Sequence, residues 1–385
     1  MINKDFYKLA EEDAENRGFD VDEVLACMER ALIGAFKKEH GNTSCKVEFN
    51  KEKNEIRLFS IHKVVEQYTS VLEAEKKEVE SSEEEQVENK ETKPEVLEPQ
   101  YAEMLLTDAK KIKSTYKIGD LVLQQENLKN YSRMTILAAG NMYKQGVRTL
   151  EREKAYHYFK DLENEMINAE VSNMGDRFLT LKLGFNVTTL LPIGELLPND
   201  HLSIGDFIKV YVKKVEQTTK EPKVVVSRTE RNLVTRLMEN YIPEIKSGII
   251  EIKGIARDPG DRTKIAIYSN DEKVDAIGSC VGEGGNRIKE IVNALGGEKV
   301  DLYKWSEDPE ELIANSLQPA SVTKVLSIDP KMRTSQVVVP DDHLSLAIGK
   351  AGQNVRLAVQ SCGWKIDIMP TSEAYEKGLI KILGL

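Results

Sequence analysis

The sequence predicts a multidomain α+β protein: an N-terminal α/β domain that ends in a long helix, a small β-barrel, and two similar α+β domains in tandem. Three observations support this prediction. The chain has 385 residues, more than one typical hydrophobic core contains. From about residue 168, about five short strand-like runs are separated by turn residues. Beyond them, one pattern of strands, helices and a glycine-rich turn occurs twice, 67 residues apart.

The N-terminal region, residues 1 to about 160, combines a helix, a hairpin and a long helical stretch. In VDEVLACMERALIGAFKK the apolar residues recur near helical spacing: Val24, Met28, Ala31, Leu32 and Phe36. CKVEFN and EIRLFSIHKVVEQY alternate like the two strands of a hairpin. A long helix is expected from about Asn127 to Met166, although Gly140 and Gly146 each cost it about 1 kcal/mol relative to alanine.

An acidic segment, about residues 73–99, interrupts this region. From Glu73 to Glu98 it holds eleven acids against four lysines, and it has no aromatic residue. Such a segment buries too little apolar surface to offset its chain entropy, so we expect a disordered insert, with an exposed solvated helix as the alternative. The segment carries −7 of the total charge of −10, so basic patches remain possible on the rest of the chain.

The composition, 40% hydrophobic and 31% charged, is that of a soluble globular protein. The sequence has no apolar run of the length a membrane helix needs, and its first residues are charged, unlike a secretory signal. We therefore expect a cytoplasmic protein that contacts no membrane. The cysteines show no CxxC spacing and are expected to be free thiols: Cys27, Cys45, Cys280 and Cys362.

Each of the two repeats carries a GxxG turn, at Gly282–Gly285 and at Gly349–Gly352. A short apolar helix precedes each turn, at Ala276–Val281 and Leu344–Ile348. One apolar helix face follows at spacing i, i+3, i+4, i+7: Ile288, Ile291, Val292 and Leu295, then Val355, Ala358, Val359 and Cys362. Glycines let the backbone come close to a ligand, and the N–H groups that begin the second helix attract an anion.

These turns differ from two other kinds of glycine loop. A nucleotide-binding loop requires GxxxxGK[ST], but Leu344 stands where its first glycine belongs and Ala351 where its hydroxyl belongs. A Rossmann loop follows a strand, whereas these turns follow a helix. An ordinary helix–turn–helix core with incidental glycines stays open as an alternative. The two-helix context, the strand order and the tandem repeat resemble KH domains of type II topology, whose GxxG loop clamps about four nucleotides of a single strand.

The KH resemblance implies two sets of RNA-binding residues. The first set is Gly282, Glu283, Gly284, Gly285, Asn286, Arg287 and Lys289. The second set is Gly349, Lys350, Ala351, Gly352, Gln353, Asn354 and Arg356. We expect the second loop to attract phosphate more strongly, because it offers Lys350 and Arg356, whereas the first has Glu283 in its middle.

The predicted barrel resembles an S1 domain, an OB-type fold that binds nucleic-acid strands by stacking bases on aromatic side chains in a positive groove. The candidate aromatic residues are Phe178, Phe185 and Tyr211. The candidate cations are Arg177, Lys182, Lys209 and Lys213. Because strands bury about half of their positions, any one of these aromatic residues can instead belong to the core.

The order S1–KH–KH, with characteristic motifs, resembles the NusA family of bacterial transcription elongation, termination and antitermination factors. From about residue 165 to 385 the matching motifs are VSRT, IPEI, ARDPGDRTKIAIYS, DLYKW, QPASVTKVL and LAIGKAGQNVRLA. The N-terminal region matches more loosely, through FDVDEVLACMERALIGAFKK and the helix that ends in TLEREK. The implied domains are residues 1–160, the S1 domain 165–229, and KH domains at 230–306 and 307–385.

The resemblance also implies a function. Residues 1–160 would bind RNA polymerase, and the S1–KH–KH body would hold the nascent single-stranded RNA. Other termination and antitermination factors are implied partners, and we expect a monomer when free. The acidic segment interrupts the polymerase-binding region, so no individual contact residue is assigned there. The sequence ends after the second KH domain, so we expect no acidic autoinhibitory tail.

No enzymatic activity, catalytic residue, cofactor or metal is expected. The five histidines form no HxxxH or HExxH set: His40, His62, His157, His201 and His343. Polynucleotide phosphorylase also carries KH and S1 modules, but in the opposite order and after two large catalytic cores. The remaining alternative is an S1/KH protein that binds RNA in RNA processing or translation.

Overall fold

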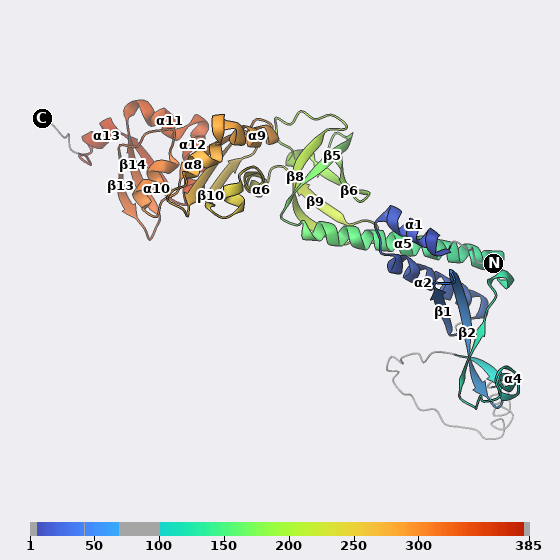
Figure 1. Ribbon diagram of the computed structural model, residues 1–385. Coiled ribbons are helices and arrows are strands. Elements are labelled where there is room, and N and C mark those ends of the chain that lie inside the picture. Colours follow the sequence, from blue (N-terminus) through green and yellow to red (C-terminus); the bar gives the residue numbers. More distant parts are fainter. Residues whose placement is uncertain (1–5, 42, 69–100, 381–385) are drawn as a thin grey trace, which may run out of the picture. The chain divides into compact units, whose positions relative to one another are not determined.

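The structure is a computed structural model that describes residues 6–41, 43–68 and 101–380. The chain divides into two compact units, Met1–Glu153 and Lys154–Leu385 (Figure 1). The acidic segment that the sequence predicts to be disordered lies outside the described residues. Within the described ranges, no helix is long and apolar enough to cross a membrane.

The first unit packs helices against a four-stranded sheet. Its helices are α1 (Phe6–Arg17), α2 (Val21–His40), α4 (Leu106–Ile112) and the 3₁₀ turn η1 (Leu128–Asn130). Its strands are β1 (Cys45–Asn50), β2 (Glu55–Val65), β3 (Ala102–Leu105) and β4 (Leu121–Gln125). The expected hairpin is confirmed, since β1 pairs antiparallel with β2 from Cys45–Ser60 to Asn50–Glu55. The far half of β2 then pairs with both β3 and β4.

The expected helix faces of this unit are confirmed with shifted ends. Helix α2 begins at a capping box formed by Asp20 and Glu23, and its predicted apolar face lies in the core. The long helix α5 spans Arg133–Asp161, so it is shorter at both ends than predicted. At its start the turn η1 intervenes, and after its end Met166 already begins a strand.

The second unit starts with a five-stranded antiparallel sheet that nearly closes into a barrel, as predicted (green to yellow in Figure 1). The strand order is β7-β6-β5-β8-β9, and β7 lies next to β9. The strands are β5 (Met166–Met174), β6 (Phe178–Gly184), β7 (Val187–Pro192), β8 (Phe207–Glu216) and β9 (Lys223–Ser227). Alternate strand residues and the end of α5, with Ala155 and Phe159, fill the interior.

The first KH domain follows the barrel. Its helices are α6 (Arg231–Tyr241), α7 (Pro243–Lys246), α8 (Ala276–Val281), the turn η3 (Glu283–Gly285) and α9 (Asn286–Ala294). Its strands are β10 (Ile250–Asp258), β11 (Arg262–Ser269) and β12 (Lys299–Lys304). The single helix expected at Glu230–Ile245 is wrong: α6 ends before Pro243, which lacks an N–H and starts a new helix.

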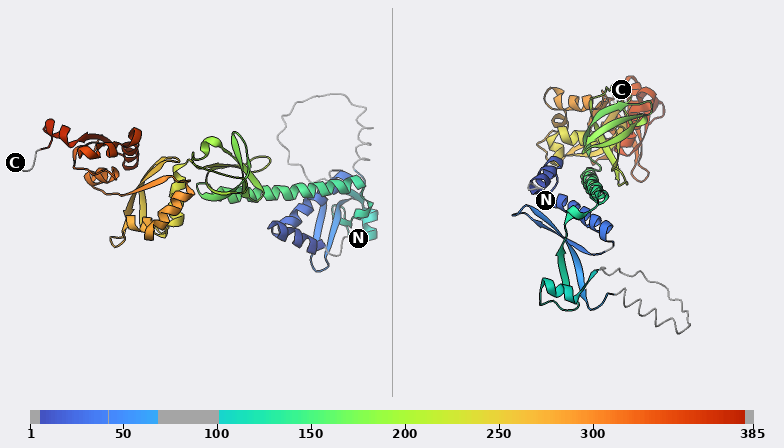
Figure 2. Two further views of the ribbon diagram at one scale, coloured as in Figure 1. Left: turned by 90° about the horizontal axis from the view of Figure 1, so that it is seen from above. Right: turned by 90° about the vertical axis from the view of Figure 1, so that its right-hand side faces the viewer.

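The second KH domain repeats this order (orange to red in Figure 2). Its helical elements are α10 (Pro309–Ser316), η4 (Asp341–His343), α11 (Leu344–Ile348), η5 (Lys350–Gly352), α12 (Gln353–Cys362) and α13 (Thr371–Glu376). Its strands are β13 (Lys324–Asp329), β14 (Thr334–Val339) and β15 (Lys365–Pro370). In both sheets the first pair of strands is antiparallel and the second is parallel, which is the predicted type II arrangement. The two predicted short helices, α8 and α11, are confirmed residue for residue.

Buried polar contacts join the parts of the second unit. Arg228, just after the barrel, forms an ion pair of 2.6 Å with Asp200 and also donates to the carbonyl of Ala294 in the first KH domain. Both side chains of this ion pair are buried, so removing one would leave the other charge without its partner. From the first KH domain, the Nζ of Lys264 donates to the carbonyls of Ser316 (2.8 Å) and Gln318 (2.6 Å).

Candidate nucleic-acid interface

The two glycine loops, Gly282–Gly285 and Gly349–Gly352, share one backbone conformation. Their first glycines have φ of 74° and 75° with ψ of 172° and 171°, a region that is almost confined to glycine. Their third residues, Gly284 and Ala351, have φ of 60° and 51°, and their last glycines 75° and 74°. The duplication inferred from the sequence therefore extends to the dihedral angles of the loop.

The first glycine of each loop is also required by close packing. A Cβ on Gly282 would lie 2.8 Å from Cγ of Arg287, and a Cβ on Gly349 would lie 2.7 Å from the backbone nitrogen of Asn354. The loop thus packs tightly against the helix that follows. Its two middle residues stay exposed in each copy: Glu283 and Gly284, then Lys350 and Ala351.

Asn354 corrects the sequence-based expectation that its side chain is offered to RNA, whereas for the partly exposed Arg287 that expectation stays a prediction. The Nη1 of Arg287 donates to the carbonyl of Ser279 (2.7 Å) and to Glu244 (2.8 Å). Asn354 is buried, and its amide donates to the carbonyl of Ala347 at 3.1 Å. Both side chains tie the loop back to the preceding helix. The pKa of Glu244 lies below its ordinary value because of a backbone hydrogen bond and the guanidinium of Arg287.

Two further residues of the second loop contact the first KH domain. The Nη2 of Arg356 lies 2.7 Å from Asp258, and the amide of Gln353 donates to Asp258 (2.8 Å) and Asp261 (2.6 Å). The Nζ of Lys350, by contrast, has no hydrogen-bond or ion-pair partner in the described part of the chain, and its side chain is exposed. The predicted positive charge of the second loop is therefore available to a ligand mainly through Lys350.

The first loop is less positive, as its sequence indicates. The Nζ of Lys289 donates to the carbonyl of Gly284 at 3.2 Å, so this lysine lies over the loop itself. Asn286 and Glu283 are exposed beside it. Phosphate binding at this loop through the backbone N–H groups that begin α9 stays a prediction.

The barrel exposes some of the predicted residues and buries others. Arg177, Phe178 and Lys182 are exposed, and Phe178 retains 45% of its accessible surface. The Nζ of Lys209 lies 5.9 Å from the centre of the Tyr241 ring. Lys213 forms an ion pair of 2.9 Å with Glu230. Whether these side chains contact RNA stays a prediction.

Tyr211 cannot be a base-stacking platform, which corrects the sequence-based expectation. Its side chain is only 4% exposed, because it packs in the core with helix α6. Its hydroxyl donates to Oδ1 of Asn164 and accepts from the amide of Asn232, each at 3.1 Å. The exposed aromatic residue of the same strand is Phe207, at 75%. The alternation Ile208, Val210, Val212, all buried, could have placed Phe207 outside.

Over the described ranges, no group of three or more His, Cys, Asp or Glu side chains is placed to hold a metal ion. All four cysteines are free thiols, as the sequence predicts.

A nearly closed OB-like barrel followed by two type II KH domains with duplicated GxxG loops defines a modular single-stranded RNA-binding protein. The family descriptions that match are the NusA N-terminal domain at residues 5–153, the NusA-like first KH domain at 228–305 and the NusA-like second KH domain at 309–376. The chain belongs to the NusA family.

Similar proteins cover almost the whole chain. The transcription termination/antitermination protein NusA of Halalkalibacterium halodurans is 37% identical over 381 residues, which are 99% of this chain and 92% of that protein. NusA of Bacillus subtilis is 36% identical, covering 95% of this chain and 90% of that protein. NusA of Thermus thermophilus is 34% identical, covering 95% and 89%.

Proposed function

We propose that this chain is a transcription factor that modulates pausing, termination and antitermination by holding the nascent single-stranded RNA near RNA polymerase. Residues 1 to about 160 bind the polymerase. The S1 domain (165–229) and the KH domains (230–306 and 307–385) bind the RNA. The observation that carries the proposal is the pair of GxxG loops with one backbone conformation, in a member of a family whose relatives are named for this activity.

The mechanism is one of positioning. Backbone N–H groups at the start of α9 and α12, together with Lys350, bind phosphates, and the glycines let the strand approach closely. Attachment to the polymerase raises the local concentration of the RNA-binding loops around the emerging transcript. The protein makes and breaks no covalent bond in this mechanism, needs no cofactor, and works as a cytoplasmic monomer that other termination and antitermination factors contact.

The RNA-binding part of the proposal is tested by placing aspartates in the second loop. Lys350→Asp combined with Ala351→Asp changes two exposed residues, so the helical circular dichroism should stay the same. We expect affinity for single-stranded RNA to fall about tenfold or more, because two negative charges replace one positive charge at the phosphate contact. Fluorescence anisotropy with a labelled oligonucleotide measures the affinity. An unchanged affinity contradicts the proposal that the second loop binds RNA.

The polymerase-binding part is tested separately. The purified chain should retain bacterial RNA polymerase on a column and change the duration of a hairpin-dependent pause in transcription with purified components. The double aspartate variant should still bind the polymerase but lose most of the effect on pausing. Failure of the unaltered chain to enrich polymerase would favour a role in RNA processing or translation instead.

A further inference from the structure

The acidic hairpin turn of the first KH domain reaches the residues that follow the GxxG loop of the second. Asp258 ends β10, and Asp261 lies in the turn that leads to β11. Asp258 accepts from the guanidinium of Arg356 at 2.7 Å and from the amide of Gln353 at 2.8 Å. Asp261 accepts from the same amide at 2.6 Å. Two carboxylates of one domain therefore hold two polar side chains of the other.

The packing of α12 on β10 sets this contact. A Cβ on Gly254 would overlap the carbonyl oxygen of Ser361, so strand and helix lie very close there. From Gly254 to Asp258 the strand covers about 13 Å, and from Ser361 back to Gln353 the helix covers about 12 Å. The carboxylates thus lie beside the first turns of α12, at the end of a helix where the dipole favours an anion.

The corresponding hairpin turn of the second KH domain uses its aspartate differently. Asp329 also ends a strand and precedes a proline. Its carboxylate accepts from the backbone N–H groups of Lys331 and Met332 in its own turn, at 2.9 and 3.2 Å. The carboxylate of Asp258 instead contacts the neighbouring domain. Its contact is therefore a property of the pair of domains rather than of the hairpin fold.

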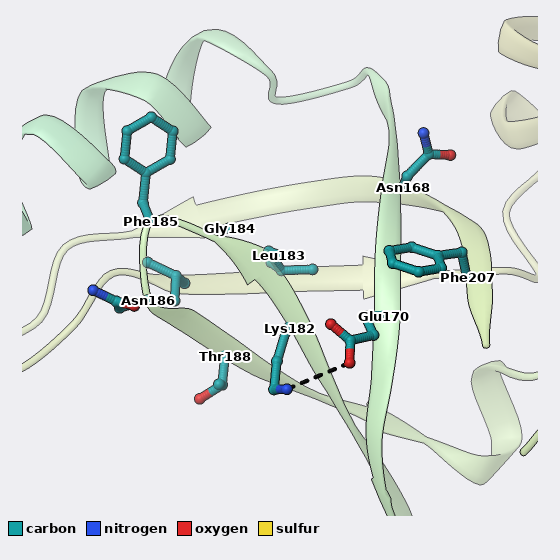
Figure 3. A pocket seen from close by; sticks show the side chains of 10 residues that line it. Asn168, Glu170, Lys182, Leu183, Gly184, Phe185, Asn186, Thr188 and Phe207 are labelled. Carbon is teal, nitrogen blue, oxygen red and sulfur yellow. Dashed lines mark hydrogen bonds and ion pairs between the residues drawn. The ribbon is translucent and has the colours of Figure 1, made fainter. Parts of the chain in front are cut away.

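Other predicted RNA-binding cations have acidic partners within their own domain. Lys182 of the barrel forms an ion pair of 3.4 Å with Glu170 of the neighbouring strand (Figure 3). In the first KH domain, Arg287 forms one of 2.8 Å with Glu244. Arg356 differs, because its acidic partner belongs to the other KH domain. A ligand that takes Arg356 therefore also changes the contact between the two domains.

The ion pair of Arg356 with Asp258 is accessible to a competing anion. The two side chains retain 53% and 38% of their accessible surface, and an ion pair this exposed adds little to stability. The pair uses one terminal nitrogen of the guanidinium, which carries five N–H donors in all. A phosphate that approaches the second loop can therefore bind Arg356 and displace Asp258.

We propose that Asp258 competes with RNA phosphate for Arg356, so that RNA binding at the second KH loop releases Arg356 from the first KH domain. Asp258 keeps the RNA affinity of the second loop below the value that its own cations would give. It is a positioning residue, since it acts on RNA through Arg356. The inference rests on the proposed function.

The test compares Asp258→Asn with Asp301→Asn in the intact chain. Asp301 forms an ion pair of the same 2.7 Å with Arg262 inside the first KH domain, so this control removes the same charge. Fluorescence anisotropy with a labelled oligoadenylate of about 20 nucleotides measures the affinity. Asp258→Asn should raise the affinity about threefold, because RNA no longer has to break an exposed ion pair. The control should bind like the unaltered chain. A lower affinity of Asp258→Asn would mean that the carboxylate supports the loop, which overturns the proposal.

The dependence on salt gives a readout that a purely structural tie would leave unchanged. When RNA displaces Asp258 in the unaltered chain, the freed carboxylate takes up a cation, which offsets part of the cation release from RNA. Asp258→Asn binds RNA without this uptake. The slope of log affinity against log salt should therefore become steeper by about 0.7. Equal slopes for Asp258→Asn and the unaltered chain would contradict competition.

A double-mutant cycle shows whether Asp258 acts through Arg356. In an Arg356→Gln background, Asp258→Asn should change the affinity for the oligoadenylate by less than about 1.5-fold, because the guanidinium for which it competes is gone. Arg356→Gln should weaken binding more in the Asp258→Asn background than in the unaltered chain. Effects of Asp258→Asn that are equal in both backgrounds would refute a role exerted through Arg356.

Two outcomes separate this inference from the proposed function. If Asp258→Asn binds RNA as Asp301→Asn does, while the double aspartate variant of the second loop loses binding, the competition is absent but the proposed function stands. If the double aspartate variant keeps full affinity, the second loop is not the RNA contact and both fail.

Discussion

Arg287 and Asn354 occupy equivalent positions in the two repeats and brace their loops with different chemistry. Arg287 donates to the carbonyl of Ser279, and Asn354 to that of Ala347, so each residue fastens its GxxG loop to the helix before it. From the sequence alone, an arginine or asparagine next to a glycine loop is readily interpreted as a ligand-binding residue. Whether its side chain faces solvent or the core depends on how the neighbouring helix packs, and the residues around the loop do not reveal that packing.

The loop glycines lead to a first prediction at this scale. Gly349→Ala should lower the free energy of unfolding of the second KH domain by about 2 kcal/mol or more, because its φ and ψ are unfavourable for alanine and its Cβ would meet the backbone of Asn354. Ala351→Gly is the matched control, since Ala351 already has a left-handed φ; it should be neutral or stabilising by less than about 1 kcal/mol.

Urea unfolding followed by tryptophan fluorescence reports on this domain, because both tryptophans, Trp305 and Trp364, pack in its core cluster. Equal midpoints for the alanine variant and the unaltered chain would contradict the strained geometry of the loop.

Lys264 gives a second prediction, a dependence of stability on pH. Burial lowers the pKa of this ammonium group from 10.5 to about 8. Between these two values the unfolded chain keeps the proton and the folded chain loses it, so stability should rise with pH from about 8 to about 10.5. Lys264→Met should remove that part of the rise.

Other lysines and tyrosines titrate in the same range, so the measurement is the difference between the two stability curves rather than either curve. Two parallel curves would mean that Lys264 keeps an ordinary pKa in the folded protein.

At the scale of elements, the contact between α12 of the second KH domain and β10 of the first depends on one glycine. A Cβ on Gly254 would lie 2.0 Å from the carbonyl oxygen of Ser361 in α12. Gly254→Ala should therefore push the helix off the strand and cost about 1–3 kcal/mol. Gly194→Ala, where a Cβ meets nothing within 4 Å, is the control and should change stability little. Urea unfolding followed by tryptophan fluorescence measures the stability of both variants. Equal unfolding midpoints for Gly254→Ala and Gly194→Ala would contradict the close contact.

Local patterns were sufficient for the elements that repeat or alternate, such as α8, α11 and the five barrel strands. They were insufficient where distant segments decide the outcome. The pairing of β2 with β3 and β4 joins segments on either side of the acidic insert, and the contact of Arg356 with Asp258 spans 98 residues. Tyr211 was kept as a candidate for base stacking because nothing in its strand shows that α6 covers it. The end of helix α6 before Pro243, in contrast, could have been predicted from the sequence, because proline lacks a backbone N–H.

Over the C-terminal part of the molecule, each KH sheet has its outer face covered by the element that follows it in the chain. The outer residues Ala266 and Tyr303 of the first sheet belong to the core cluster of the second KH domain. In the second sheet the equivalent residues are Val338 and Met369, and Ala374 of α13 packs against them. Helix α13 thus covers a surface of the kind that, in the first domain, binds another KH domain.

This arrangement predicts self-association when the helix is displaced. Ala374→Glu would place a charge in a fully buried position, so α13 should detach, with a loss of at least about 1 kcal/mol, and expose Val338 and Met369. An exposed apolar sheet face beside intact KH helices permits head-to-tail contacts between copies, so sedimentation should show concentration-dependent association. Glu376→Ala changes a residue on the exposed side of α13, so this control variant should sediment like the unaltered chain. If both variants sediment alike, α13 does not protect the sheet from association.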